Sequence, residues 1–360
     1  MTKEENIGIL LKNFVESQKD IEIAFVYSNQ GLLISKYGNI EKEIYDEQER
    51  DEIYGALTSL VENLLDKISL EYKIGHYGSG SFETPDHRIV YLEAGPEAIL
   101  LLVCSYNIDL NKLFPIAYLV VEKIAQLLEE SFDFNYNTLE IPDLQINENI
   151  SVNLDMYALK ESSNLIGGVK VVHQIKKEED VEKLFKLIVL GSKAVGKTTL
   201  INRFLKKEVI IDYRPTLGIS ISTQKYFVQG FKEDVVKFLI YDFAGQEYFK
   251  RVRHEYYKGA KCAFVVYDVT RRETFDDAIN FWFKDARREL GNLPIVLIGN
   301  KIDLEKQREI SKEVGLNKAH ELKCSFIETS ALHNINVQDT FKIVGIGLFF
   351  KHLEENSITR

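Results

Sequence analysis

The chain has 360 residues, which is too long for one ordinary domain and predicts two. Hydrophobic residues make up 45% of it, as expected of a folded chain with true cores. The formal net charge of -10 argues against general binding to nucleic acid, because that requires a basic surface. We therefore expect no nucleic-acid partner.

Cys104, Cys262 and Cys324 lie in apolar stretches and show no paired spacing. Such a set predicts reduced thiols in hydrophobic cores, and so a cytoplasmic protein. No stretch approaches the ~18 apolar residues that span a bilayer. The N-terminus lacks the apolar segment of a signal peptide, and no cysteine near the C-terminus is available for a lipid. We expect no intrinsic membrane anchor, although a partner could still recruit the chain to a membrane.

Residues 1–130 read as one domain that contains helices and strands. Ile7, Leu10, Leu11 and Phe14 repeat at helical spacing, and that helix ends near residues 17–20. The elements expected after it are strands at 21–27 and 32–37, an amphipathic helix at 53–68, strands at 72–79, 88–93 and 98–105, and a helix at 110–130.

Residues 131–182 have a different pattern. From Phe132 to Leu154 apolar and polar residues alternate with a period of two, and the segment is poor in the Gly, Ser and Pro of a free tether. We therefore expect an extended linker that docks against a surface and leads into a second domain at 183–360.

Strands alternate with helices from residue 184 onward, which is typical of a doubly wound, mostly parallel sheet. The runs are short and apolar, as expected for strands buried on both faces. The candidate strands are residues 184–190, 235–241, 262–267, 295–299 and 325–329.

Residues 191–198 fit the P-loop pattern G-x-x-x-x-G-K-[ST], after a strand and at the start of a helix. Glycines let the backbone N–H groups and the helix N-terminus face phosphate groups. Lys197 is expected to reach the β- and γ-phosphates, and the Thr198 hydroxyl to bind Mg²⁺. The expected nucleotide-binding residues here are Gly191, Ser192, Lys193, Ala194, Val195, Gly196, Lys197, Thr198 and Thr199.

Two further motifs distinguish guanine from adenine. Asn300, Lys301 and Asp303 follow a predicted strand, and a carboxylate at Asp303 can accept both the N1–H and the N2 amino group of guanine. The Lys301 stem can lie along the base. After another strand, the backbone at Ser330 and Ala331 can read the guanine O6. Together they predict a guanine nucleotide.

With these motifs, residues 184–352 resemble a Ras-superfamily small GTPase, closest to the Rab-like group. Residues 213–218 are similar to the family's first switch and residues 242–247 to its second. The resemblance implies that Thr216 and Asp242 bind Mg²⁺ with Thr198, and that the Gly245 N–H meets the γ-phosphate. It also implies that Gln246 orients the attacking water, so that Gln246, Lys197 and Thr216 are the expected catalytic residues.

Three positions depart from the family pattern or have two readings. Lys193 could stabilise charge near the γ-phosphate, obstruct a partner's arginine, or point to solvent. Phe243 replaces a threonine, which should be tolerated because the motif uses its backbone and the flanking residues. Arg214 could act as an arginine finger within the chain or face an effector.

Residues 25–34 and the helix at 54–68, with the order of elements around them, resemble the roadblock family of dynein light-chain-like domains. That family implies an α+β fold with an antiparallel sheet, and a dimer that regulates small GTPases. A longin domain is the alternative, but it begins with a strand, whereas a helix comes first here.

The sequence therefore predicts a Mg²⁺-dependent GTPase that acts as a molecular switch in signal transduction, cycling between GTP and GDP, with a dimerising, regulatory N-terminal domain. A scaffold that binds GTP or GDP with negligible turnover is the alternative function. An ATPase would leave Asp303 without a role.

Overall fold

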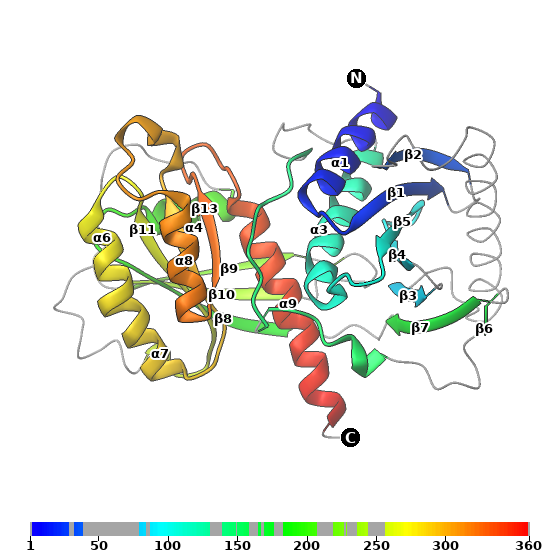
Figure 1. The fold of residues 1–360 in the computed structure, drawn as a ribbon. Coiled ribbons are helices and arrows are strands. Elements are labelled where there is room, and N and C mark those ends of the chain that lie inside the picture. Colours follow the sequence, from blue (N-terminus) through cyan, green and yellow to red (C-terminus); the bar gives the residue numbers. More distant parts are fainter. Residues whose placement is uncertain are drawn as a thin grey trace. The chain divides into compact units, whose positions relative to one another are not determined.

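The computed structural model describes residues 2–28, 32–38, 79–83, 87–129, 139–148, 150–157, 165–166, 169–175, 183–206, 219–226, 228, 236–243 and 256–358. These residues belong to two compact units (Figure 1). Unit 1 comprises Met1–Ile141, Asn153–Asp180 and Val228–Glu233, and unit 2 comprises Pro142–Val152, Val181–Phe227 and Asp234–Arg360. The expected linker at 131–182 is thus shared between the units, and the domain limits 1–130, 131–182 and 183–360 stay a prediction.

Unit 1 contains a sheet in the order β2-β1-β5-β4-β3-β7-β6. All neighbouring strands pair antiparallel, so the predicted antiparallel sheet is confirmed. The strands are β1 (Ile21–Ser28), β2 (Leu33–Gly38), β3 (Ser79–Glu83), β4 (His87–Glu93), β5 (Ala98–Ser105), β6 (Leu165–Ile166) and β7 (Val169–Ile175).

Helices α1 (Lys3–Ser17) and α3 (Leu110–Leu128) belong to unit 1 and contact each other. Helix α1 begins with a capping box, in which Thr2 Oγ1 accepts from the Glu5 N–H while Glu5 accepts from the Thr2 N–H. The predicted face of α1 is buried, with Phe14 fully covered. None of the helices in the described part of the chain is long and apolar enough to cross a membrane.

Two predicted elements of unit 1 lie wholly or mostly outside the described residues. Strand β3 covers Ser79–Glu83 and overlaps the strand predicted at 72–79 only at Ser79, while residues 72–78 are outside the described residues, so that strand stays a prediction. The helix predicted at 53–68 also lies outside them. Strand β7, which comes from the expected linker, pairs with β3 and extends the sheet. A short 3-10 helix, η2 (Leu154–Tyr157), precedes it.

Unit 2 contains a six-stranded sheet in the order β13-β12-β11-β8-β10-β9. Neighbours are parallel except β9, which is antiparallel to β10, so the sheet is mixed and mostly parallel. The strands are β8 (Lys183–Leu190), β9 (Ile219–Tyr226), β10 (Val236–Phe243), β11 (Ala260–Asp268), β12 (Ile295–Asn300) and β13 (Ser325–Thr329). The five predicted strands are confirmed, and β9 was missed because its polar edge sequence lacks an apolar run.

Helices pack against the sheet of unit 2 (Figure 1). Helices α4 (Lys197–Phe204) and α9 (Val337–Ile358) contact each other, with Phe204 stacked on Phe341 at 4.0 Å between ring centroids. The other helices are α6 (Arg272–Asp277), a π-helical turn η5 (Ala278–Phe283), α7 (Lys284–Leu290), the 3-10 helix η6 (Ile302–Gln307) and α8 (Lys312–Leu322). Trp282, Phe326 and Tyr267 belong to one hydrophobic core with them.

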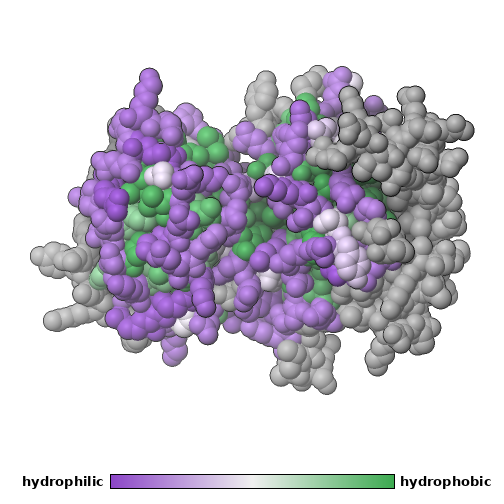
Figure 2. Space-filling view, viewed as in Figure 1, coloured by the Kyte–Doolittle hydropathy of each residue, from purple (hydrophilic) through white to green (hydrophobic). Residues whose placement is uncertain are grey.

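A segment from the expected linker is part of unit 2. We call residues 142–152 the strap; residue 149 is outside the described residues. Figure 1 draws the strap as a teal-green trace beside the red helix α9. On the face of unit 2 seen in Figure 2, hydrophilic residues predominate and hydrophobic side chains show between them. The prediction of an extended, docked segment fits the strap.

Candidate functional site

The P-loop connects strand β8 to helix α4. Gly191 and Gly196 have φ values of +144° and +97°, which residues with side chains rarely adopt. A Cβ at Gly191 would lie 2.2 Å from the Val266 carbonyl oxygen, and one at Gly196 would lie 2.3 Å from Asn300 Nδ2. Both glycines are therefore required by the curl of the loop and by the strands beneath it, as the motif predicts.

Lys197 begins helix α4 and folds back over the loop. Its Nζ donates hydrogen bonds to the carbonyl oxygens of Gly191 and Ser192, each at 2.9 Å. Burial lowers the pKa of Lys197 to about 8, while the nearby Asp242 carboxylate acts in the opposite direction. The ammonium group thus lies at the loop backbone, where an anion held by the loop would compensate its burial.

Thr198 and Asp242 meet between α4 and the end of β10. The Thr198 hydroxyl donates a short hydrogen bond to Asp242 Oδ2, and Asp242 is only 3% exposed. A hydroxyl and a carboxylate oxygen are hard donors of the kind that Mg²⁺ prefers. The pair therefore fits a magnesium site chemically. Thr199, the next residue of α4, is half-buried.

Asn300, at the end of β12, connects the P-loop to the loop after β13. Its Nδ2 donates to the Val195 carbonyl oxygen at 2.9 Å. Its Oδ1 accepts from the Ala331 N–H and from the Thr329 hydroxyl, both at 3.1 Å. The side chain is 1% exposed, so these three hydrogen bonds lie out of water. One buried amide thus fixes the phosphate loop relative to the base loop.

Asp303 lies in η6, opposite the loop after β13. Its Oδ1 accepts a hydrogen bond from Ser330 Oγ at 2.5 Å. Ser330 is also bonded through its backbone to Ile335, and its hydroxyl accepts from the His333 N–H. The structure therefore brings together the two predicted base-reading motifs, because their side chains bond to each other directly.

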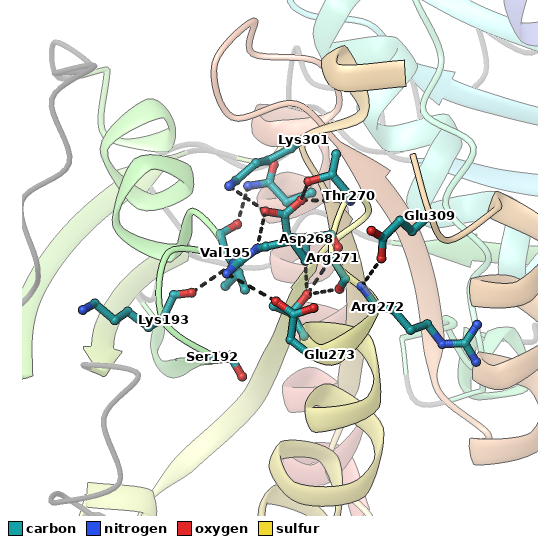
Figure 3. Close-up of polar contacts among 12 residues, drawn as sticks. Ser192, Lys193, Val195, Asp268, Thr270, Arg271, Arg272, Glu273, Lys301 and Glu309 are labelled. Carbon is teal, nitrogen blue, oxygen red and sulfur yellow. Dashed lines mark hydrogen bonds and ion pairs between the residues drawn. The ribbon is translucent and has the colours of Figure 1, made fainter. Parts of the chain in front are cut away.

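Lys301 adopts a left-handed backbone with φ of +73° and reaches toward β11 (Figure 3). Its Nζ forms an ion pair of 2.6 Å with Asp268, which is 1% exposed at the end of β11. Burial would raise the pKa of Asp268, but the hydrogen bonds from Lys301 and Thr270 outweigh it and lower that pKa. Lys301 is thereby held in place by a buried charge.

A group of residues that was not predicted from the sequence supports this site. Asp268 accepts hydrogen bonds from both the N–H and the hydroxyl of Thr270, and from Arg271 Nε at 3.0 Å. Arg271 Nη2 in turn donates to the Lys193 carbonyl oxygen in the P-loop at 3.0 Å. The sequence signal for this group was weak: Asp268 is an acidic residue at the end of an apolar run, which is strand β11.

Two predicted positions in the P-loop have side chains that turn in different directions. Ser192 Oγ donates to Asp277 Oδ2 at 2.7 Å and accepts from Trp282 Nε1 at 3.2 Å, so it is tied to the helix that contains the π-helical turn. The Lys193 side chain is exposed and extends away from the Asp268 cluster (Figure 3). The three readings of Lys193 stay predictions. Ala194 has a φ of +61° and is exposed.

Phe243 is a core residue of unit 2. It is 1% exposed and packs against Tyr257 with 6.1 Å between ring centroids. Residues 244–255 after it lie outside the described residues, as do residues 207–218. The predicted roles of Thr216, Gly245 and Gln246, and the two readings of Arg214, therefore have no structural description.

Within the described residues, no group of three or more His, Cys, Asp or Glu side chains is arranged to hold a metal ion. The expected magnesium site has a different composition, with hydroxyl groups and one carboxylate. The sheet order, the glycine-lined P-loop after β8 and the base-reading loops after β12 and β13 together define a small-GTPase fold with a P-loop nucleotide site.

Comparison with known proteins agrees with this class. Residues 186–346 match the Ras family. Ras-related protein RABA6a of Arabidopsis thaliana is 39% identical over 169 residues, which cover 46% of this chain and 70% of that protein. Ras-related protein Rab11B of Nicotiana tabacum is 38% identical over 165 residues, covering 46% and 74%. Ras-related protein Rab2BV of Beta vulgaris is 35% identical over 168 residues, covering 46% and 77%.

The chain therefore belongs to the Ras family, through its C-terminal part. Membership implies binding of GTP and GDP and, in general, a GTPase activity. The predicted Rab-like GTPase domain is confirmed.

Proposed function

We propose that the chain is a Mg²⁺-dependent GTPase that switches between GTP- and GDP-bound states. The observation that carries the proposal is the set of three buried hydrogen bonds at Asn300, because they join the phosphate loop and the base loop into one site. A site that reads both ends of a nucleotide needs this connection between its halves.

The phosphate half of the site consists of residues 191–199. Backbone N–H groups at the start of α4 face an anion favourably, since the helix dipole adds to their hydrogen bonds. Lys197, held at the loop backbone, then supplies a positive charge to the β- and γ-phosphates. Binding of that charge to phosphate offsets the cost of its burial.

The hydroxyl of Thr198 and the carboxylate of Asp242 would hold Mg²⁺ together with Thr216. When bound, the ion would neutralise negative charge on the β- and γ-phosphate oxygens. Thr216 enters the proposal through its motif alone.

Hydrolysis is assigned to Gln246, which would orient the attacking water in line with the γ-phosphate while the Gly245 N–H meets the phosphate. This assignment rests on residues 242–247 and their resemblance to the second switch. Thr216 and Gly245 would hold the switches in the GTP state and release them after hydrolysis.

Guanine is selected by Asp303, with Lys301 alongside the base and the backbone of Ser330 and Ala331 at O6. The hydrogen bond from Ser330 supports the role of Asp303, because it fixes one carboxylate oxygen and so the plane of the group. The ion pair with Asp268 likewise supports the placement of Lys301.

Single-turnover hydrolysis of GTP and ATP by the wild type and by Gln246→Leu tests this proposal. We expect GTP but not ATP to be hydrolysed, and the substitution to slow the reaction at least about a hundredfold, as loss of a water-orienting group does. Tight GTP binding with no turnover in the wild type would instead favour the scaffold reading.

For unit 1 we propose a roadblock-like domain that dimerises and regulates the GTPase. The helix-first order supports it over a longin domain, and the antiparallel sheet agrees with the fold that the roadblock resemblance implies. The mass of the full chain in solution, measured with GDP and with GTP, tests the dimer, and a monomer in both states contradicts it. We also propose a cytoplasmic location, supported by the three buried free cysteines; localisation of a tagged full-length chain by microscopy tests it.

A further inference from the structure

The strap pairs with the edge of the GTPase sheet. Strand β13 is the outermost strand on its side of that sheet. The Gln145 N–H donates to the Phe326 carbonyl oxygen at 3.0 Å, and the Phe326 N–H donates to the Gln145 carbonyl oxygen at 3.3 Å. The strap thus satisfies backbone groups that an open edge would leave to solvent.

Side chains anchor the strap on both sides of this pairing. Asn147 Nδ2 donates to the Lys323 carbonyl oxygen at 2.8 Å, and the Asn147 N–H donates to Ser325 Oγ at 3.2 Å. Asp143 forms an ion pair of 2.5 Å with Lys312 of α8. These contacts join the strap to the beginning of β13 and to the helix before it.

The C-terminal helix has a glycine where the strap passes. Ile150 is fully buried, and a Cβ at Gly347 in α9 would lie 2.4 Å from the Ile150 carbonyl oxygen. A glycine inside a helix costs about 1 kcal/mol relative to alanine. The close approach of strap and helix accounts for a glycine at this point.

The far end of β13 carries the base-reading loop. Phe326 pairs with the strap, and Ser330 follows four residues later (330 − 326). Between them, Glu328 accepts two hydrogen bonds from Arg308, at 2.6 and 3.2 Å, and Thr329 bonds to Asn300. The strand is therefore held along its whole length, and the strap holds its outer edge.

We propose that the strap is a positioning element for the base-reading loop and sets the rate at which guanine nucleotide is released. The inference rests on the proposed function of Ser330 and Ala331 at the guanine O6. Detachment of the strap loosens β13 and displaces the loop, while the phosphate loop keeps its own contacts. Unit 1 continues the chain on both sides of the strap.

The test uses full-length protein with a matched pair of substitutions at one position. Gln145→Pro removes the backbone N–H that bonds to Phe326, whereas Gln145→Ala keeps it and removes only a side chain that contacts Asp143. The measurements are the release rate of fluorescently labelled GDP and the ratio of GDP to ADP affinity.

We expect Gln145→Pro to release GDP at least about fivefold faster, the effect of one lost hydrogen bond, and to prefer GDP over ADP less strongly. Gln145→Ala should match the wild type in both measurements. The change in preference for GDP over ADP separates positioning of the base-reading loop from general destabilisation, because the base is the only part of the nucleotide that this loop is proposed to contact. Asn147→Ala, which removes the bond to Lys323, should change both measurements in the same direction.

The inference is overturned if Gln145→Pro releases GDP at the wild-type rate and prefers GDP over ADP as strongly as the wild type does. An equal loss of GDP affinity and ADP affinity in that variant would also overturn it. If Gln145→Pro unfolds at the assay temperature, Asn147→Ala becomes the test. A wild-type GDP release rate and a wild-type ratio of GDP to ADP affinity in Asn147→Ala would then overturn the inference. A wild-type chain with no preference for GDP over ADP would instead overturn the proposed function, so the two failures are distinguishable.

Discussion

Replacement of Asn300 by alanine should separate the two halves of the nucleotide site. The substitution removes three buried hydrogen bonds, to Val195, Thr329 and Ala331. Each is worth about 1 kcal/mol net, so the loss is about 3 kcal/mol, and more if the Ala331 N–H stays buried without an acceptor. Thr329→Val is the matched control, because it removes one of the three bonds at nearly constant volume and should cost about 1 kcal/mol.

Thermal unfolding followed by the fluorescence of Trp282 measures these losses. Trp282 is the only tryptophan of the chain and is 4% exposed in the core of unit 2, so its signal reports that unit. At roughly 2–4 °C for each kcal/mol in a domain of this size, Asn300→Ala should lower the melting temperature by roughly 6–12 °C and Thr329→Val by roughly 2–4 °C. GDP should protect the wild type much more than Asn300→Ala. Equal melting temperatures for Asn300→Ala and Thr329→Val would refute the reasoning.

Three further predictions concern the base, the buried acid and the P-loop. Asp303→Asn exchanges one acceptor for a donor, so binding should shift from GDP toward xanthosine diphosphate, which carries an oxygen in place of the guanine amino group; unchanged preference in competition assays would contradict the role of Asp303. The lowered pKa of Asp268 gives stability that is present above its unfolded pKa and lost as pH falls through the folded pKa, so Lys301→Ala should move acid unfolding to higher pH; an unchanged midpoint counts against the ion pair. GDP binding should change Trp282 fluorescence, and Ser192→Ala should reduce that change; the same amplitude in both proteins would rule out Ser192 as the connection.

The strands of unit 2 could be predicted because burial on both faces leaves continuous apolar runs such as Ile295–Asn300. Strand β9 could not, since alternate residues such as Thr223 and Lys225 face solvent at the edge of the sheet. In unit 1 the run Ala98–Ser105 was recognised with its true limits. Residues 80–83 of strand β3 were not predicted, because the small residues Gly80 and Ser81 give no periodic signal.

The nucleotide motifs could be found from spacing, because each lies at the end of a strand whose position was already clear. What spacing could not reveal is which side chains meet. The bonds from Asn300 to Val195, and from Arg271 to the Lys193 carbonyl oxygen, join residues far apart in the sequence. The alternating pattern near Gln145 predicted docking, but nothing in it identified β13 as the surface.

The strap also bears on how this chain can be divided. Both units take residues from several stretches of sequence: the GTPase unit uses 142–152 and then 181–227, and the intervening 153–180 belong to the other unit. No single cut yields either unit intact, and a fragment that starts at β8 leaves behind Gln145, Asn147 and Ile150. Such a fragment would expose the edge of β13 and the surface of α9 at Gly347. Its nucleotide affinity would therefore not represent that of the full chain. Each unit therefore depends on residues that the sequence places within or beyond the other unit.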